Sequence, residues 1–305
     1  MYTRREFGKL TLAGLAIPRM AFAATSTING VHLGAQTYSF RDIPRTPGAA
    51  DAVDVVIKAL TDCGLSECEL FSPQLEPAQP TFGRGQRGSP EAMKAREDLR
   101  KWRVETPLDH FRGVKKKFDA AGITIHALCW NMNTSFTDAE IDRGFEIGKA
   151  LGAKVLTSST TLDVAKRIAP IADKHQMAIG MHGHSNVTDP NEFATPESFA
   201  KGMKMSKYFK INLDIGHFVS ADFDPIAYLK EHHADITNLH IKDRKARQGD
   251  NTPWGQGDTP IREVLQLLKK ERWPIPAYIE YEYRGPGTPV EEVKKCFEYS
   301  KQALA

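Results

Sequence analysis

The 305-residue sequence predicts an α/β fold, a closed (β/α)8 TIM barrel, and three observations support it. Eight short apolar or β-branched runs recur along the chain, segments with helical periodicity separate them, and each of the last four runs ends in a residue able to bind metal. Strictly alternating strands and helices require parallel strands joined by right-handed crossovers. A doubly wound open sheet is the alternative, but eight units favour closure.

The eight predicted strands are, in chain order, Val31 to Thr37, Leu65 to Phe71, Ile123 to Leu128, Lys154 to Ser158, Met177 to His182, Lys210 to Asp214, Ile236 to Ile241 and Ala277 to Glu282. Between them, residues 52–60 and 261–268 carry apolar side chains at helical spacing. Gly64, Gly122 and Gly152 are typical of helix ends. These elements account for residues 24–305 as one domain.

Residues 1–23 are predicted to be a twin-arginine signal peptide. Arg4 and Arg5 precede a short apolar stretch, and Ala21 and Ala23 are small residues at the two positions that a signal peptidase recognises. An amphipathic N-terminal helix is the alternative. We therefore expect periplasmic localisation, with export of the protein already folded.

The charge balance excludes some classes of partner. Residues 1–23 carry a net charge of +3, which equals that of the whole chain, so residues 24–305 are formally neutral. Neutrality argues against nucleic acid or an anionic membrane as a partner. No other apolar run approaches the roughly 20 residues of a membrane span. We expect a small-molecule partner, and the sequence leaves a homo-oligomer open.

An insertion at about residues 72–106 breaks the even rhythm of the barrel. It is far longer than the usual βα loop of about 2–6 residues, and it contains a charged helical segment from Pro90 to Trp102. In a barrel it would rise from the mouth. One interpretation is a lid, with Arg84, Arg87 or Trp102 reaching a substrate, and the other is a solvated decoration or a subunit contact.

Four residues at strand ends predict a metal site. They are separated by 32, 26 and 40 residues, about one βα unit per step, and are His182, Asp214, His240 and Glu280. Because the C-terminal strand ends of a barrel converge on one mouth, four successive strands can supply ligands to a single ion. Two imidazoles and two carboxylates suit Mn²⁺ first, with Co²⁺, Zn²⁺ or Mg²⁺ as alternatives.

The positions of the cysteines indicate whether this metal site is open or closed. A structural zinc site is closed and usually includes thiolates, but no cysteine lies at these four strand ends, which favours an open catalytic metal. The chain has no CxxC pair and no regular cysteine framework, so buried thiols are favoured over disulfides for Cys63, Cys68, Cys129 and Cys296.

Individual strand ends leave alternatives open. Asp214 closes an apolar strand, where a buried carboxylate needs a partner or a cation, although it could instead cap a helix. Strand alternation places His240 and Lys242 on one face, and Lys242 could fix a substrate oxygen or pair with Asp243. Glu280 and Glu282 also share a face, with Glu280 deeper and Glu282 at the rim.

The fifth strand is ambiguous, because His182 and His184 share a face and either could bind the ion. We favour His182 as the ligand, with His184 as a substrate contact or proton shuttle. Gln36 and Tyr38 of the first strand and Glu69 of the second would complete the mouth as substrate-binding residues.

The order and spacing of these motifs resemble the xylose-isomerase-like TIM barrels known as sugar phosphate isomerases/epimerases. The resemblance runs over essentially all of residues 24–305. The segments that carry it are Leu33 to Arg41, His182-Gly183-His184, Asp214-Ile215-Gly216-His217, His240-Ile241-Lys242-Asp243, Gly255-Gln256-Gly257-Asp258 and Ile279-Glu280-Tyr281.

The resemblance implies a divalent ion that binds adjacent sugar oxygens, polarises a carbonyl and stabilises an enediolate. It implies that Asp214 and His240 bind metal, that Glu280 binds metal and transfers a proton, and that His217 orients the substrate. The family's ketose epimerases have a glutamate on strand five, where this chain has His182. A carboxylate facing an imidazole is compatible with isomerisation on one face or with elimination beside a carbonyl.

The expected function is therefore a metal-dependent isomerase or epimerase of a free or oxidised carbohydrate, with Glu280, His182 and His217 as catalytic residues. One alternative is a lyase that cleaves 3-keto-glycosides by β-elimination. Another is a sugar-binding barrel without catalysis. A nuclease on the same barrel would need a basic face, which the neutral charge does not provide.

Overall fold

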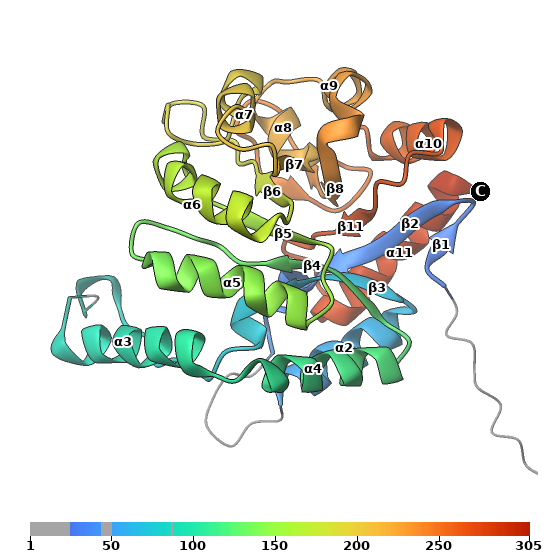
Figure 1. Cartoon of the computed structure of the whole chain (residues 1–305). Helices are drawn as coiled ribbons and strands as arrows, with labels where there is room; N and C mark the ends of the chain where they lie inside the picture. Colours follow the sequence, from blue (N-terminus) through green and yellow to red (C-terminus); the bar gives the residue numbers. More distant parts are fainter. Residues whose placement is uncertain (1–24, 44–50, 87) are drawn as a thin grey trace, which may run out of the picture.

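The computed structural model describes residues 25–43, 51–86 and 88–305 (Figure 1). The predicted signal peptide, residues 1–23, lies outside the described residues. Within the described part of the chain, no helix has the length and apolarity needed to cross a membrane.

Eight parallel strands form a closed barrel. They are β2 (Val31–Gln36), β3 (Glu67–Phe71), β4 (Thr124–Cys129), β5 (Val155–Ser159), β6 (Ile179–His182), β7 (Phe209–Asp214), β8 (Ile236–Ile241) and β11 (Ala277–Ile279). The hydrogen-bonded order is β2-β11-β8-β7-β6-β5-β4-β3, and β2 also pairs with β3, which closes the sheet. The predicted fold is confirmed. The last predicted strand is three residues too long, because β11 ends at Ile279 and Glu280 follows it.

Helices surround the barrel, as Figure 1 shows. They are α2 (Ala52–Cys63), α3 (Pro90–Glu105), α4 (Leu108–Ala120), α5 (Asp138–Ala150), α6 (Leu162–His175), α7 (Pro196–Met203), α8 (Ile215–Ser220), α9 (Pro225–His232), α10 (Ile261–Glu271) and α11 (Pro289–Leu304). In α2, Val53, Val56 and Leu60 form the buried face at helical spacing. Gly64 follows with a φ of +73°, a left-handed conformation that ends the helix with little strain.

Two short antiparallel additions flank the barrel. Strand β1 (Thr27–Ile28) pairs with β2. Strands β9 (Asp243–Arg244) and β10 (Asn251–Thr252) form a two-stranded pair directly after β8. Because it follows the C-terminal end of a barrel strand, the β9–β10 hairpin lies on the side of the barrel where loops build sites.

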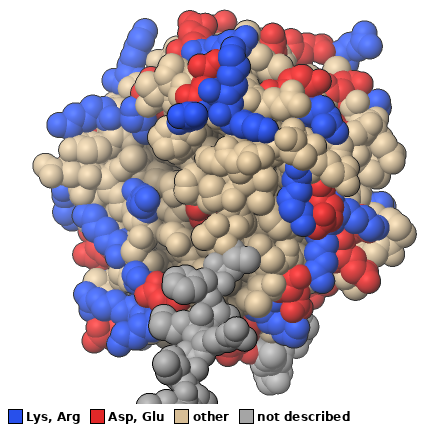
Figure 2. Space-filling model, turned by 90° about the vertical axis from the view of Figure 1, so that its right-hand side faces the viewer, with Lys and Arg blue, Asp and Glu red and all other residues tan. Residues whose placement is uncertain are grey.

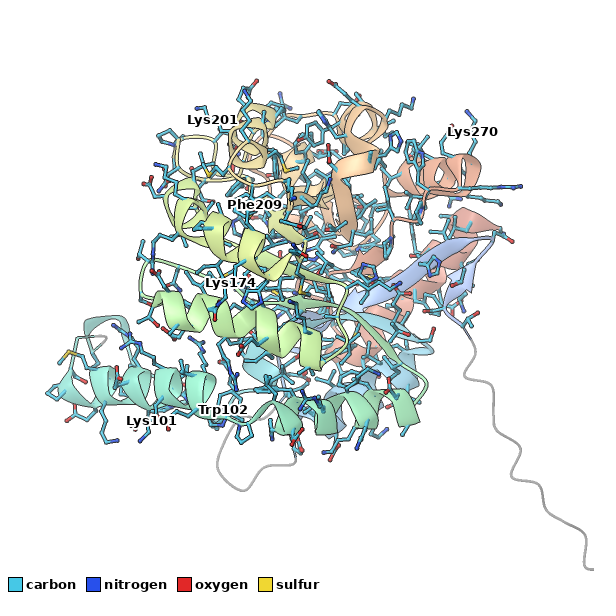
Figure 3. All side chains as sticks on the ribbon, in the orientation of Figure 1. Lys101, Trp102, Lys174, Lys201, Phe209 and Lys270 are labelled. Atoms are coloured by element: carbon cyan, nitrogen blue, oxygen red, sulfur yellow. The ribbon has the colours of Figure 1, made fainter. Side chains whose placement is uncertain are left out.

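The insertion contributes α3, which extends beyond the barrel in Figure 1. Arg103 anchors it through Glu76 (2.8 Å) and through Glu140 of α5 (3.1 Å). Trp102, labelled in Figure 3, lies near the C-terminal end of α3. Its ring packs edge-on against Phe111 of α4, with ring centroids 5.8 Å apart. Trp102 therefore supports the decoration interpretation rather than a lid. Residue 87 lies outside the described residues, and the side chain of residue 84 is not described either.

The described surface agrees with the neutral charge of residues 24–305. On the face drawn in Figure 2, Lys and Arg side chains are interspersed with Asp and Glu around a largely uncharged centre. An electrostatic footprint for nucleic acid would need a field of one sign. The four cysteines are buried and unpaired, as expected, and burial raises the pKa of Cys63 to about 12.

Candidate metal centre

The barrel brings the four predicted ligands together at one mouth. His182 is the last residue of β6 and Asp214 the last of β7, while His240 pairs in register with Asp214 from β8. Glu280 follows β11, and its backbone N–H donates to Ile241 O (3.0 Å). One ligand atom from each of the four residues lies within 4.8 Å of the other three. The convergence that strand-end spacing predicted is present.

Each of these residues has one polar atom left over. His182 Nδ1, Asp214 Oδ2, His240 Nδ1 and Glu280 Oε2 are buried and have no hydrogen-bond partner. The two oxygens form ion pairs with Lys242 Nζ, and Glu280 Oε2 lies 3.2 Å from His240 Nδ1. An unsatisfied buried polar group costs about 1–3 kcal/mol, so such atoms are rare without a purpose. A divalent cation would satisfy all four at once. Two oxygens and two nitrogens suit Mn²⁺, Co²⁺ or Zn²⁺, so the residues present fit a metal ion.

Asp214 caps a helix with one oxygen and leaves the other available for the metal role considered for it. Its Oδ1 accepts a hydrogen bond from the His217 backbone N–H (2.7 Å) and caps helix α8. Its Oδ2 faces the cluster without a hydrogen-bond partner. The cap therefore orients the carboxylate and leaves one oxygen for a cation.

His182 and His184 differ in what surrounds them. His182 is buried and its Nδ1 has no partner. The side chain of His184 is 37% exposed, with Nδ1 3.4 Å from Glu192 and Nε2 3.5 Å from Ser159 Oγ. The geometry favours His182 as the ligand and leaves His184 in the cavity wall.

Lys242 is the charged neighbour of the cluster. Its Nζ lies 2.9 Å from Asp214 Oδ2, 2.7 Å from Glu280 Oε2 and 2.7 Å from Glu282 Oε2. Burial alone would lower the pKa of Lys242, but the three carboxylates raise it above its ordinary value. Predicted as a substrate contact, Lys242 instead lies behind the carboxylates and does not line the cavity. It acts as an internal counter-charge.

The carboxylates respond in opposite directions to this environment. Burial raises the pKa of Asp214 to about 6, with Lys242 opposing the rise. Burial also acts to raise the pKa of Glu280, but Lys242 and His240 hold it well below its ordinary value. At neutral pH both carboxylates are therefore ionised.

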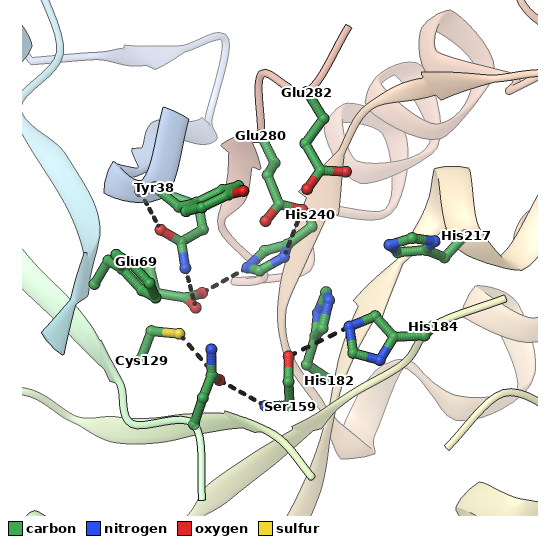
Figure 4. Close-up of a pocket in the computed structure, with 13 residues that line it drawn as sticks. Tyr38, Glu69, Cys129, Ser159, His182, His184, His217, His240, Glu280 and Glu282 are labelled. Carbon is green, nitrogen blue, oxygen red and sulfur yellow. Dashed lines mark hydrogen bonds and ion pairs between the residues drawn. The ribbon is translucent and has the colours of Figure 1, made fainter. Parts of the chain in front are cut away.

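A cavity of about 180 Å³ opens over the cluster (Figure 4). Of the predicted substrate-binding residues, Gln36, Tyr38, Glu69 and His184 line it, as do His182, His217, His240 and Glu280. Sequence reasoning missed part of the lining, namely Phe71, Cys129, Asn131 and Ser159, and placed Glu282 at the rim. Three of the missed residues end β3, β4 or β5, so the strand-end rule applied to the early strands would have found them.

Glu69 lines the cavity but has little capacity for a substrate. Its Oε1 accepts from Gln36 Nε2 (3.2 Å) and Thr157 Oγ1 (2.6 Å). Its Oε2 accepts from Asn238 Nδ2 (2.8 Å) and lies 2.8 Å from His240 Nε2. A carboxylate offers about four acceptor positions, and all are used.

His217 is held by a residue that sequence reasoning did not identify. Arg244 Nη1, from β9, lies 2.6 Å from His217 Nδ1 and 3.0 Å from Ser185 Oγ. Burial and the nearby Lys242 lower the pKa of His217, so the ring is neutral at pH 7. With Nδ1 accepting from Arg244, Nε2 carries the hydrogen and can donate to a substrate oxygen.

An overlapping set of three imidazoles, from His182, His184 and His217, also has ligand atoms within 4.8 Å of one another. The Arg244 guanidinium beside His217 places a positive charge next to this set. A second cation is therefore less well accommodated there than in the cluster that holds two carboxylates.

Comparisons with known proteins agree with this architecture. The chain has 19% identity and a TM-score of 0.60 to a sugar phosphate isomerase/epimerase from Parabacteroides distasonis, covering 90% of this chain and 95% of that one. It has 11% identity and a TM-score of 0.58 to a 3-keto-D-glucoside 4-epimerase from E. coli, covering 89% and 99%. It has 15% identity and a TM-score of 0.60 to an IOLI protein with a bound zinc atom, covering 89% of this chain and 97% of that one.

No curated protein matches the chain. At these identities the structural likenesses show the fold alone. The sequence model of the family described as "Xylose isomerase-like TIM barrel" matches residues 92–302, more than half of the chain. The protein belongs to the xylose isomerase-like TIM barrel family.

Proposed function

We propose that this protein is a divalent-metal-dependent isomerase or epimerase that acts on a free or oxidised carbohydrate. The observation that carries the proposal is the set of four buried atoms without hydrogen bonds, two nitrogens and two oxygens, gathered beneath an open cavity. When bound, Mn²⁺ or a similar ion would supply Lewis acidity to a substrate carbonyl and make the adjacent C–H bond more acidic.

The residues around the cavity suit proton transfer next to a carbonyl. Glu280 is held ionised by Lys242 and His240 and can accept a proton. His182, across the cluster, is neutral because burial and the nearby imidazoles lower its pKa. A carboxylate and a neutral imidazole form an asymmetric pair, suited to removing a proton on one side of a substrate. His217 Nε2–H would orient a substrate oxygen.

The lining also bears on the substrate class. Among the described residues that line the cavity, none is Lys or Arg. A phosphate group usually requires such a partner, which supports a neutral sugar over a sugar phosphate. A ketone made by prior oxidation of a glycoside would acidify its neighbouring C–H bonds, and the fold is shared with a 3-keto-D-glucoside 4-epimerase.

The decisive experiment incubates metal-loaded protein in deuterated water with a panel of free sugars and 3-keto-glycosides. Deuterium at a carbon next to the carbonyl is expected, detected by NMR. Release of the aglycone instead would identify the β-elimination alternative. If Glu280→Gln binds sugar with unchanged affinity and the wild type incorporates no deuterium with any substrate, the protein is a sugar-binding barrel.

We also propose export to the periplasm, on the basis of Arg4 and Arg5 and the small residues at positions 21 and 23. Cell fractionation of the full chain should find the shortened protein in the periplasm. Replacing both arginines by lysine should retain it, uncleaved, in the cytoplasm. If the wild type and the double lysine variant were found in the same fractions, the proposal would be contradicted.

A further inference from the structure

Glu69 is a completely buried carboxylate at the meeting point of several strands. It lies on β3 with 0% exposure and accepts hydrogen bonds from Gln36 of β2, Thr157 of β5 and Asn238 of β8. Its fourth contact is His240, also on β8. With every acceptor position in use, Glu69 is rigidly held and has no free oxygen site for a substrate hydroxyl.

His240 lies between two carboxylates that face different ring nitrogens. Nε2 is 2.8 Å from Glu69 Oε2, while Nδ1 is 3.2 Å from Glu280 Oε2 and has no hydrogen-bond partner (Figure 4). Burial acts to lower the pKa of His240, but Glu69 and Glu280 raise it well above its ordinary value in the metal-free protein. An imidazole that binds a metal is neutral, so it carries one hydrogen and only the other nitrogen can be the ligand. The partner that takes this hydrogen therefore decides which nitrogen can be the ligand.

A competing contact must be weighed. Asn212 Nδ2 also lies 3.1 Å from His240 Nε2, and Asn238 donates to Asn212 Oδ1 (3.2 Å), which keeps the Asn212 nitrogen toward the ring. If Asn212 donated to Nε2, the ring hydrogen would lie on Nδ1. The bond to the Glu69 carboxylate is shorter and charge-assisted, so it is the stronger of the two.

We propose that Glu69 is a positioning residue of the metal centre, which holds the His240 hydrogen on Nε2 and so presents the Nδ1 lone pair to the ion. The inference deepens the proposed function and rests on it only in taking the four-residue cluster to bind a metal. A carboxylate behind a metal-binding imidazole fixes the ring orientation and raises its basicity.

Glu69→Gln tests this role with little change in side-chain volume. Whichever way the amide turns, His240 Nε2 loses its charged acceptor, so the ring hydrogen and the ring orientation are held less firmly. Mn²⁺ affinity measured by calorimetry should fall about 10- to 100-fold. The matched control is Thr157→Val, which removes a partner of the other Glu69 oxygen but keeps the His240 contact. Its affinity should stay within about threefold of wild type. Equal losses in both variants, or an unchanged Glu69→Gln, would overturn the inference.

A spectroscopic measurement decides the same point without a variant, including the case in which Glu69→Gln does not fold. Two-bond ¹H–¹⁵N NMR of the Zn²⁺-loaded wild type should show His240 with a metal-shifted Nδ1 and a hydrogen on Nε2. Coordination through Nε2 would refute the positioning role. Metal uptake without deuterium exchange into any sugar would refute the proposed isomerase yet leave the role of Glu69 standing, and a wild type that binds no metal would overturn both.

Discussion

The two halves of the barrel mouth differ in how fully the polar side chains that line the cavity or form the four-residue cluster are satisfied. On the half formed by β2 to β5, Gln36, Glu69 and Ser159 have hydrogen-bond partners within the protein. On the half formed by β6, β7, β8 and β11, four residues each keep a buried atom without one. The difference teaches that the first half supports and shapes the site, whereas the second half keeps ligand atoms free of hydrogen bonds that a bound cation could use.

The half formed by β6, β7, β8 and β11 is called the unsatisfied half below, and the half formed by β2 to β5 the satisfied half. The largest effect is expected from Asp214→Asn, which changes a residue of the unsatisfied half. Asparagine can still cap helix α8 through its side-chain oxygen, but the carboxylate that faces the cluster is lost. Mn²⁺ affinity should fall on the order of 1000-fold, more than the loss of an outer partner costs. Calorimetry measures it. The matched control is Asp224→Asn, which alters the N-cap of α9 and should leave affinity unchanged. An equal loss in both variants would show that capping matters rather than metal binding.

The next effect concerns Lys242, whose positive charge partly compensates the carboxylates of the unsatisfied half. Lys242→Met leaves Asp214 and Glu280 buried with only the His240 imidazole beside them, which should cost about 3 kcal/mol of unfolding free energy in metal-free protein. Saturating Mn²⁺ should recover most of this loss, because the ion restores positive charge. Urea denaturation with and without chelator measures both values. A loss of the same size in both conditions would contradict the idea that Lys242 and the metal serve the same carboxylates.

A smaller, pH-dependent effect is expected in the insertion that belongs to the satisfied half. Burial acts to raise the pKa of Glu140, but its bonds to Thr137 and Arg103 lower the pKa overall. A lowered folded-state pKa means that the stabilisation is fully present above the unfolded value of 4.5 and is lost as pH falls through the folded pKa. Hydrogen exchange of α3 should therefore accelerate below about pH 4.5, before that of the barrel strands.

Arg103→Ala gives the control for that pH effect. Without the guanidinium, α3 should exchange faster already at pH 7, and the additional acceleration in acid should shrink. If α3 responds to acid as strongly in the variant as in the wild type, other carboxylates control its attachment.

The smallest effect on Mn²⁺ affinity is expected from a substitution in the satisfied half, at Asn131. Asn131 lines the cavity, and its side-chain oxygen accepts from the Ser159 backbone N–H (2.8 Å), but it offers no atom to the cluster. Asn131→Ala should change Mn²⁺ affinity less than about threefold while it raises KM for the sugar. Affinity is measured by calorimetry and KM by the deuterium-exchange assay. A large loss of Mn²⁺ affinity in Asn131→Ala would contradict the conclusion that the two halves have different roles.

Much of the fold and of the site was predictable because its signals are local. Apolar runs followed by Gly64 or Gly152 mark where helices give way to strands, and β alternation decides which residues share a face. The roles of individual side chains were less predictable. Lys242 was expected in the cavity but is buried behind the carboxylates, and Arg244 was not identified at all, because its contact with His217 depends on how the β9–β10 hairpin folds back.

The sequence by itself determined the alternation of eight strands and helices and the four candidate ligand side chains at the strand ends. Both can be predicted from hydrophobic periodicity and residue type, which are properties of short segments of the sequence. Only the tertiary structure decided which atom of each side chain is left free. Asp214 has two oxygens and His240 two nitrogens, and the choice between them depends on partners from other segments, such as Glu69, 171 residues from His240 along the chain. Barrel closure brings such partners together, and no local pattern encodes that distance.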